Sequence, residues 1–138
     1  MNAAARRSPG SSPDRAPNPR LILVVEDDAQ VRWFTGTVLR DEGGYEVVEA
    51  RHGAEALELL ARLPHPPALV VTDVRMPSID GRTLGRRLAR EWPGLPVLYM
   101  AAYDSGPERG EAPLEPFVAK PYDPHAFLAE VARLLGRD

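Results

Sequence analysis

The sequence feature that most constrains the fold is a series of short apolar runs separated by segments with helical spacing. Three of the runs end in charged residues: residues 21–25 in Glu26, Asp27 and Asp28, residues 68–72 in Asp73, and residues 117–119 in Lys120. Such runs, alternating with helices, are typical of buried parallel strands, whose carboxyl ends form functional crevices. Carboxylates gathered in one crevice repel each other unless a cation lies among them, and hard oxygen ligands favour Mg²⁺. The pattern therefore predicts a parallel sheet with a magnesium site at one edge.

Size and composition indicate one globular domain. The chain has 138 residues, of which 43% are apolar and 27% are charged, and its net charge of −3 argues against a general nucleic-acid binder. The absence of cysteine excludes disulfides, a thiol nucleophile and a cysteine-based zinc site. No apolar run approaches the roughly 20 residues of a membrane helix. We therefore expect a cytoplasmic protein that makes no direct contact with nucleic acid or membrane.

Composition divides the chain into a tail and a folded part. Residues 1–19 are rich in Pro, Ser, Ala and Arg and lack apolar periodicity, which predicts a disordered N-terminal tail, followed by one domain over residues 20–138. Apolar runs and alternation predict strands at residues 21–25, 45–49, 68–72, 96–100 and 115–119. Helical spacing predicts helices at residues 28–41, 54–63, 81–91, 104–113 and 124–135. Glycines and prolines within residues 104–113 should keep that helix short.

Five strand–helix units predict a doubly wound, flavodoxin-like α/β fold with five helices. Parallel strands require helical crossovers on both faces of the sheet, and right-handed crossovers leave few topologies. The strand order 2-1-3-4-5 places the first strand beside the third, with the topological switch point between them. Asp27 and Asp73 would then face each other across that point. Val31, Phe34, Thr35 and Val38 should form the inner face of the first helix.

With these motifs in this order, the chain resembles the receiver domain of two-component response regulators, of the chemotaxis-regulator type. The resemblance covers residues 20–136 and rests on residues 21–28, residues 72–77 with Asp80 and Gly81, and residues 117–121. The strand at residues 96–100 is similar to that of receivers attached to hybrid sensor kinases. The resemblance implies a phosphorelay function, with output through contact with another protein or by passing the phosphoryl group on, since the sequence ends at residue 138.

The resemblance also implies a role for each site residue. Asp73 matches the aspartate that accepts a phosphoryl group from a histidine kinase or phosphotransfer protein. Glu26 and Asp27 match the acidic pair that holds Mg²⁺, together with Asp73 and the backbone carbonyl of Arg75. Lys120 matches the lysine that pairs with the phosphoryl oxygens and so shares the catalytic role with Asp73. Mg²⁺ and the lysine would neutralise charge, so that an anionic carboxylate can attack an anionic donor.

The resemblance also implies a conformational switch that involves two positions, and in this chain neither position carries a hydroxyl group. The family places Ser or Thr at the end of the fourth strand, where this chain has Ala101, which has no hydroxyl donor. The aromatic residue that reports the switch matches Phe117, which also lacks a hydroxyl. One charge-assisted hydrogen bond is worth about 1.5–3 kcal/mol. We therefore expect phosphorylation to persist but to couple less strongly to conformation.

Taken singly, each motif also has a structural explanation. Glu26, Asp27 and Asp28 could serve as a helix N-cap, Asp73 as a turn residue and Lys120 as a surface lysine. Their joint placement at three strand ends favours the functional interpretation. The three histidines show no metal-ligand spacing and are interpreted as surface residues: His52, His65 and His125. Trp33 precedes the expected core position Phe34 and would suit a binding hot spot for the kinase or phosphotransfer partner.

Three classes of function stay open from the sequence. The leading hypothesis is a phospho-accepting receiver, which promotes its own phosphorylation and dephosphorylation and is not a conventional enzyme. The alternative is a degenerate receiver that binds a protein partner without phosphorylation, an interpretation that Ala101 favours. A Mg²⁺-dependent hydrolase would be supported by a second carboxylate two residues after Asp73, but Arg75 occupies that position.

Overall fold

A five-stranded parallel sheet forms the centre of the molecule. The computed structural model describes residues 16–102, 116–120 and 122–136. The strands are β1 (Asn18–Val25), β2 (Glu46–Ala50), β3 (Pro67–Asp73), β4 (Val97–Ala102) and β5 (Phe117–Lys120). Their order is β2-β1-β3-β4-β5 and all neighbouring pairs are parallel. The predicted strand order is therefore confirmed, with β2 at one edge as its alternating sequence suggested.

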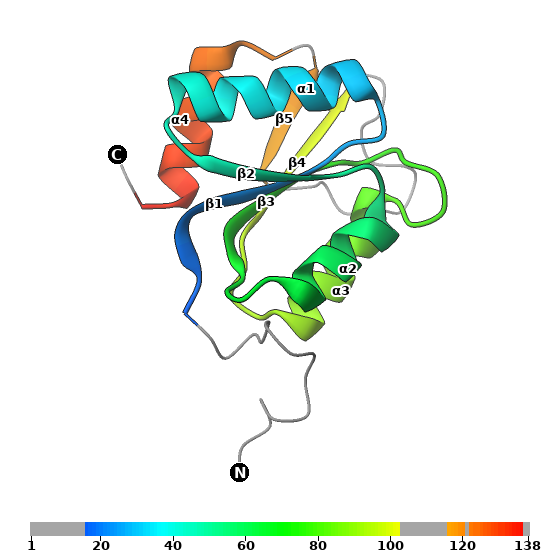
Figure 1. Cartoon of the computed structure of the whole chain (residues 1–138). Coiled ribbons are helices and arrows are strands. Elements are labelled where there is room, and N and C mark those ends of the chain that lie inside the picture. The colour runs from blue at the N-terminus through cyan, green and yellow to red at the C-terminus, as the bar shows by residue number, and fades with distance from the viewer. Residues whose placement is uncertain (1–15, 103–115, 121, 137–138) are drawn as a thin grey trace.

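Helices cover both faces of the sheet, as parallel crossovers require. The helices are α1 (Ala29–Thr37), which continues as the π-helical segment η2 (Val38–Glu42), then α2 (Gly53–Arg62), α3 (Gly81–Glu91) and α4 (Pro124–Leu134). Figure 1 shows α1 and α4 on one face and α2 and α3 on the other. The helix predicted at residues 104–113 lies outside the described residues. None of the described helices is long and apolar enough to cross a membrane.

Local sequence explains where the helices begin. The side chains of Asp28, Asp80 and Asp123 each accept a hydrogen bond from a backbone N–H of the first helical turn. His52 does the same for α2 through Nδ1, 3.1 Å from the Glu55 nitrogen. An acceptor at this position satisfies a donor that has no partner within the helix. Asp28 therefore caps α1 and fixes the point at which the chain leaves β1.

Strand β1, which lies between β2 and β3, is buried on both faces, and its alternating side chains contribute to two cores. Ile22 and Val24 pack in the cluster that includes Phe127 of α4, while Leu23 and Val25 pack in the cluster formed with α2 and α3. All four β1 side chains are fully buried. Each contributes about 1.5–3 kcal/mol relative to an exposed position. This burial anchors the end of β1, from which the acidic residues follow.

The inner face of the first helix differs from the prediction. Thr35 and Val38 are buried as expected, but Val31 is only half-buried and Phe34 is 42% exposed. The helix changes to π geometry at Val38, where the Gly43 nitrogen donates to the Val38 oxygen over 3.1 Å. The wider turn brings Leu39 into the core in addition to Val38. Phe34 instead lies beside the Tyr122 ring, with ring centroids 5.8 Å apart.

The first strand also begins earlier than expected. β1 starts at Asn18, inside the segment that composition assigned to the tail, because the Asn18 N–H donates to the Pro66 oxygen over 2.9 Å. Proline-rich composition hid this pairing, since Pro17 and Pro19 flank Asn18 and proline is unfavourable within a strand. The chain therefore enters the sheet at the amino end of β3.

Candidate functional site

The carboxyl ends of three strands bring the predicted charged residues together. Glu26 and Asp27 follow β1, Asp73 is the last residue of β3, and Lys120 is the last residue of β5. Val25 is paired with Thr72 in the β1–β3 register, so the residues that follow them lie at adjacent positions. All five strands run in the same direction, and their ends therefore meet at one edge of the sheet.

Three carboxylates form the acidic part of this site. Glu26, Asp27 and Asp73 each offer an oxygen atom, and these atoms lie within 4.8 Å of one another. Glu26 is 1% exposed and Asp73 is 6% exposed, whereas Asp27 is open to solvent. Two buried acids and one exposed acid make a cluster of hard oxygen donors with a solvent-facing side. This donor set fits Mg²⁺, which binds few protein carboxylates and keeps several waters.

Lys120 joins two of the three carboxylates. Its Nζ atom donates to Glu26 Oε1 over 2.8 Å and lies 3.2 Å from Asp73 Oδ1. Its side chain is largely buried, so water screens these ion pairs less than surface pairs. The ammonium therefore offsets part of the repulsion between Glu26 and Asp73, and it holds their oxygen atoms on the same side of the site.

Backbone and side-chain contacts fix Glu26 from the other direction. Glu26 Oε2 accepts a hydrogen bond from the Asp28 N–H over 3.1 Å, so the residue that caps α1 also orients this carboxylate. Arg32 Nη1 donates to the Glu26 carbonyl over 2.9 Å, and Arg32 Nε lies 3.7 Å from Glu49 Oε1. The loop between β1 and α1 is thereby tied to α1 and to the edge strand.

The backbone around Asp73 is tightly enclosed by the start of α3. The Gly81 N–H donates to the Val74 oxygen over 2.7 Å, and the Val74 N–H donates to the Met100 oxygen over 3.0 Å. A Cβ atom at position 81 would lie only 2.3 Å from the Asp73 carbonyl oxygen. Glycine is required at this close approach because any side chain would displace the backbone of Asp73. The Asp80-Gly81 pair of the sequence motif thus positions Asp73.

Burial dominates the ionisation of the site. Burial raises the pKa of Glu26 to about 7, and the negative charge of Asp73 contributes to this rise. The hydrogen bond from Lys120 acts in the opposite direction and lowers this pKa. Burial also raises the pKa of Asp73, against the charge of Lys120. For Lys120, burial alone would lower the pKa, but the hydrogen bonds and charges of Glu26 and Asp73 outweigh it and raise that pKa. A bound cation would favour ionisation of both acids.

The remaining predicted residues lie at different distances from this cluster. Ala101 is buried in β4 opposite Ala119, the residue before Lys120, so its methyl group stands near the site and offers no hydrogen-bond donor. Arg75 is exposed in the loop after β3. Phe117 is exposed at the start of β5, where it pairs with Tyr99, three residues before Lys120.

Two contacts around the site were not anticipated from sequence. Arg32 was not singled out, because an arginine on an exposed helix is usually solvated. The Tyr122 hydroxyl donates to Thr35 Oγ1 over 2.9 Å, which ties the segment after Lys120 to α1. The one available signal was the position of Tyr122, two residues after Lys120 and next to a proline.

Trp33 is 65% exposed on α1, as its place in the sequence predicted.

In the metal-free protein we expect the free energy of unfolding to fall as pH rises from about 5 to about 8. The unfolded chain ionises Glu26 near its ordinary pKa of 4.5, whereas the folded state keeps the proton up to about pH 7. Raising the pH through this window therefore favours the unfolded state, by roughly 3 kcal/mol in all. Urea denaturation in the presence of a chelator measures the effect.

Two substitutions separate this effect from general charge effects. Glu26→Gln should flatten the pH dependence, because no carboxyl then titrates at that buried position. Glu42→Gln removes an exposed carboxyl on η2 and should leave the slope unchanged. A free energy of unfolding that increases with pH across the same window would show that folding does not raise the pKa of Glu26.

Comparisons with known proteins agree with the fold. The family model described as the response regulator receiver domain matches residues 22–132. Response regulator MprA of Mycobacterium leprae is 40% identical over 119 residues, which cover 84% of this chain and 51% of the relative. Response regulator Rre1 of Synechocystis sp. is 32% identical over 124 residues, covering 86% of this chain and 53% of the relative. The chain thus spans about half the length of the curated relatives it matches.

Solved structures give the same result. A putative response regulator from Chloroflexus aurantiacus superposes with a TM-score of 0.71 at 31% identity, covering 87% of this chain and 100% of that one. The receiver domain of the hybrid histidine kinase CckA superposes with a TM-score of 0.63 at 36% identity, covering 83% of this chain and 98% of that one. From the family match over residues 22–132 and these structural relatives, we conclude that the chain belongs to the response regulator receiver domain family.

Proposed function

We propose that Asp73 accepts a phosphoryl group from a histidine kinase or phosphotransfer protein and that the chain acts as a receiver in a two-component phosphorelay. One observation carries the assignment of residues: Lys120 Nζ bridges Glu26 and Asp73, whose oxygen atoms lie with that of Asp27 within 4.8 Å. A nucleophilic carboxylate, a cation-binding pair and an ammonium are the groups that phosphoryl transfer to an acid requires.

The proposed chemistry places Asp73 as the nucleophile. An Asp73 oxygen forms a bond to phosphorus while the bond from phosphorus to the donor's imidazole nitrogen breaks, and the imidazole keeps that electron pair. Lys120 Nζ lies 3.2 Å from Asp73 Oδ1 and is therefore within reach of the oxygens of a phosphoryl group attached there. The buried backbone of Asp73 fixes the attacking group, so little ordering is left for the reaction itself.

The acidic residues supply the place for a metal ion. Glu26, Asp27, Asp73 and the backbone carbonyl of Arg75 are the groups that would hold Mg²⁺. When bound, Mg²⁺ would neutralise charge between the acceptor carboxylate and the phosphoryl oxygens. Glu26 is held by the Asp28 N–H and by Lys120, so it can shape the site without moving. Asp27, which is exposed, presents its carboxylate at the solvent side of the site.

We propose that phosphorylation is only weakly coupled to a conformational change through β4. Ala101 takes the place where a hydroxyl would donate to a phosphoryl oxygen, and Phe117 has no hydroxyl to form a new hydrogen bond after the switch. Phosphorylation biases a two-state element only through contacts that differ between its states. Partner contact at α1 is a separate part of the proposal, because Trp33 is a large exposed aromatic residue on this helix. We place this relay in the cytoplasm.

Replacing the acceptor tests the function directly. In the presence of Mg²⁺ and a small acyl-phosphate donor, the intact mass of the wild-type chain should increase by one phosphoryl group, whereas Asp73→Asn should show no increase, because an amide is not a nucleophile here. Asp41→Asn removes an exposed carboxyl on η2 and should behave as wild type. Uptake by Asp73→Asn at the wild-type level would show that another residue is the acceptor.

Restoring the hydroxyl tests the proposed weakness of the switch. Ala101→Thr should enlarge the amide chemical-shift changes that accompany phosphorylation, because the new hydroxyl can donate a charge-assisted hydrogen bond worth about 1.5–3 kcal/mol. The control is Ala101→Val, because valine has nearly the same shape as threonine but no hydroxyl. It separates the effect of the donor from the effect of added bulk at this buried position. Equal shift changes in wild type, the Thr variant and the Val variant would contradict the role assigned to the missing hydroxyl.

A further inference from the structure

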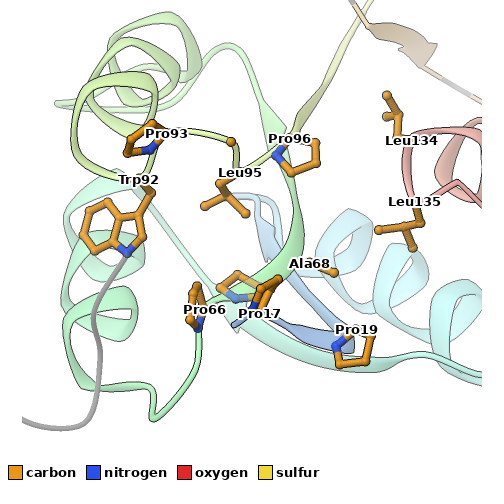
Figure 2. Close-up of a pocket in the computed structure, with 12 residues that line it drawn as sticks. Pro17, Pro19, Pro66, Ala68, Trp92, Pro93, Leu95, Pro96, Leu134 and Leu135 are labelled. Atoms are coloured by element: carbon orange, nitrogen blue, oxygen red, sulfur yellow. The ribbon is translucent and has the colours of Figure 1, made fainter. Parts of the chain in front are cut away.

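An apolar groove lies at the edge of the sheet opposite the charged site. It has a volume of about 370 Å³ and is formed where β1, β3 and β4 begin and where α3 and α4 end. Figure 2 shows the Trp92 indole and Pro66 at one end of the groove and Leu134 and Leu135 at the other. The volume falls within the roughly 300–1,000 Å³ of small-molecule and cofactor pockets. The phosphoryl-transfer proposal makes no use of this groove.

The lining has an unusual chemistry. Six prolines contribute to it: Pro17, Pro19, Pro66, Pro67, Pro93 and Pro96. Together with Trp92 they give a rigid surface of rings that loses little side-chain entropy on binding. Grooves that present aromatic side chains, as this one presents Trp92, recognise proline-containing segments in the polyproline II conformation, which pay a small ordering cost because the conformation is preformed. The groove therefore suits an extended peptide that contains proline.

Trp92 supplies a second and independent indication. It is 9% exposed, and its Nε1 donor is buried with no hydrogen-bond partner among the residues that the structure describes. A buried donor left without an acceptor destabilises the folded state. A carbonyl of a peptide lying at this end of the groove would remove that destabilisation. The carbonyl of the residue before a proline can accept this hydrogen bond. The proline itself has no backbone N–H, so no donor of that residue is left without a partner.

The path of the chain identifies the peptide that is nearest. His65 Nδ1 lies 3.1 Å from the Ala16 carbonyl oxygen, and the Asn18 N–H donates to the Pro66 oxygen, so residues 16–18 run along the wall of the groove. Residues 1–15 precede this point directly. They contain Pro9 and Pro13 within a stretch of Ser and Gly, and they contain no aromatic or branched aliphatic residue.

We propose that the groove binds the chain's own N-terminal segment through Pro9 and Pro13, with a backbone carbonyl of the segment accepting a hydrogen bond from Trp92 Nε1. Attachment at Ala16 gives the segment an effective concentration of roughly millimolar, so contacts too weak for a free peptide suffice within one molecule. The groove is thus a peptide-binding site that is separated from Asp73 by the length of the strands.

The indole N–H of Trp92 reports occupancy in the full chain. The chain contains two tryptophans, and a Trp33→Phe variant assigns the two indole N–H signals in a ¹⁵N-labelled sample. Trp33 is exposed and serves as an internal reference for an indole in water. We expect the Trp92 N–H to exchange more slowly with solvent than the Trp33 N–H. Pro9→Ala combined with Pro13→Ala should shift the Trp92 signal and speed its exchange about tenfold, with the Trp33 signal unchanged.

Ser11→Ala combined with Ser12→Ala alters the same stretch, keeps both prolines and should leave the Trp92 signal in place. A Trp92 signal that is identical in wild type and in the double proline variant would overturn the proposal. A Trp92 signal that moves on roughly tenfold dilution would show that the segment of a second copy fills the groove, and this would also overturn binding within one chain.

Discussion

The ion pairs of Lys120 with Glu26 and Asp73 are the interaction on which the site depends. Two buried carboxylates at neighbouring strand ends repel each other, and burial itself opposes their charge. The Lys120 ammonium lies 2.8 Å from Glu26 Oε1 and 3.2 Å from Asp73 Oδ1 and offsets part of that repulsion. This compensation is incomplete, because the pKa values of Glu26 and Asp73 remain raised. The site is therefore prepared for additional positive charge, and this preparation links metal binding to phosphoryl acceptance.

The sheet explains how residues 94 positions apart in sequence reach each other. Parallel strands place all their carboxyl ends at one edge, so Glu26 and Lys120 meet although they come from the first and last strands in the chain. The same rule places all amino ends at the opposite edge, where prolines and Trp92 gather around the apolar groove. One architecture thus separates a charged site, suited to an anionic group, from an apolar site suited to a peptide.

Sequence patterns predicted the strand order and the residues at the charged edge, because runs such as residues 21–25 are long, apolar and followed at once by acids. They misplaced Phe34, since the helical period alone did not fix which side of α1 faces the sheet, and of the adjacent residues Phe34 and Thr35 only Thr35 is buried. They also missed Arg32, whose contact with the Glu26 carbonyl depends on a loop shape that no local motif encodes. The groove was missed for a similar reason: its prolines come from segments distant in sequence, and each looked like an isolated turn residue.

We infer that the raised pKa values of Glu26 and Asp73 prepare this site for a divalent cation. Calorimetric titration with Mg²⁺ at about pH 6 and about pH 8, in buffers of different ionisation enthalpy, tests it most directly. The account predicts binding at both pH values, tighter at the higher one, with protons released at the lower one as Glu26, with its pKa of about 7, ionises. It also predicts that Asp27→Ala binds far more weakly. Mg²⁺ binding that releases no protons at either pH, or an absence of binding by the wild-type chain, would contradict the account.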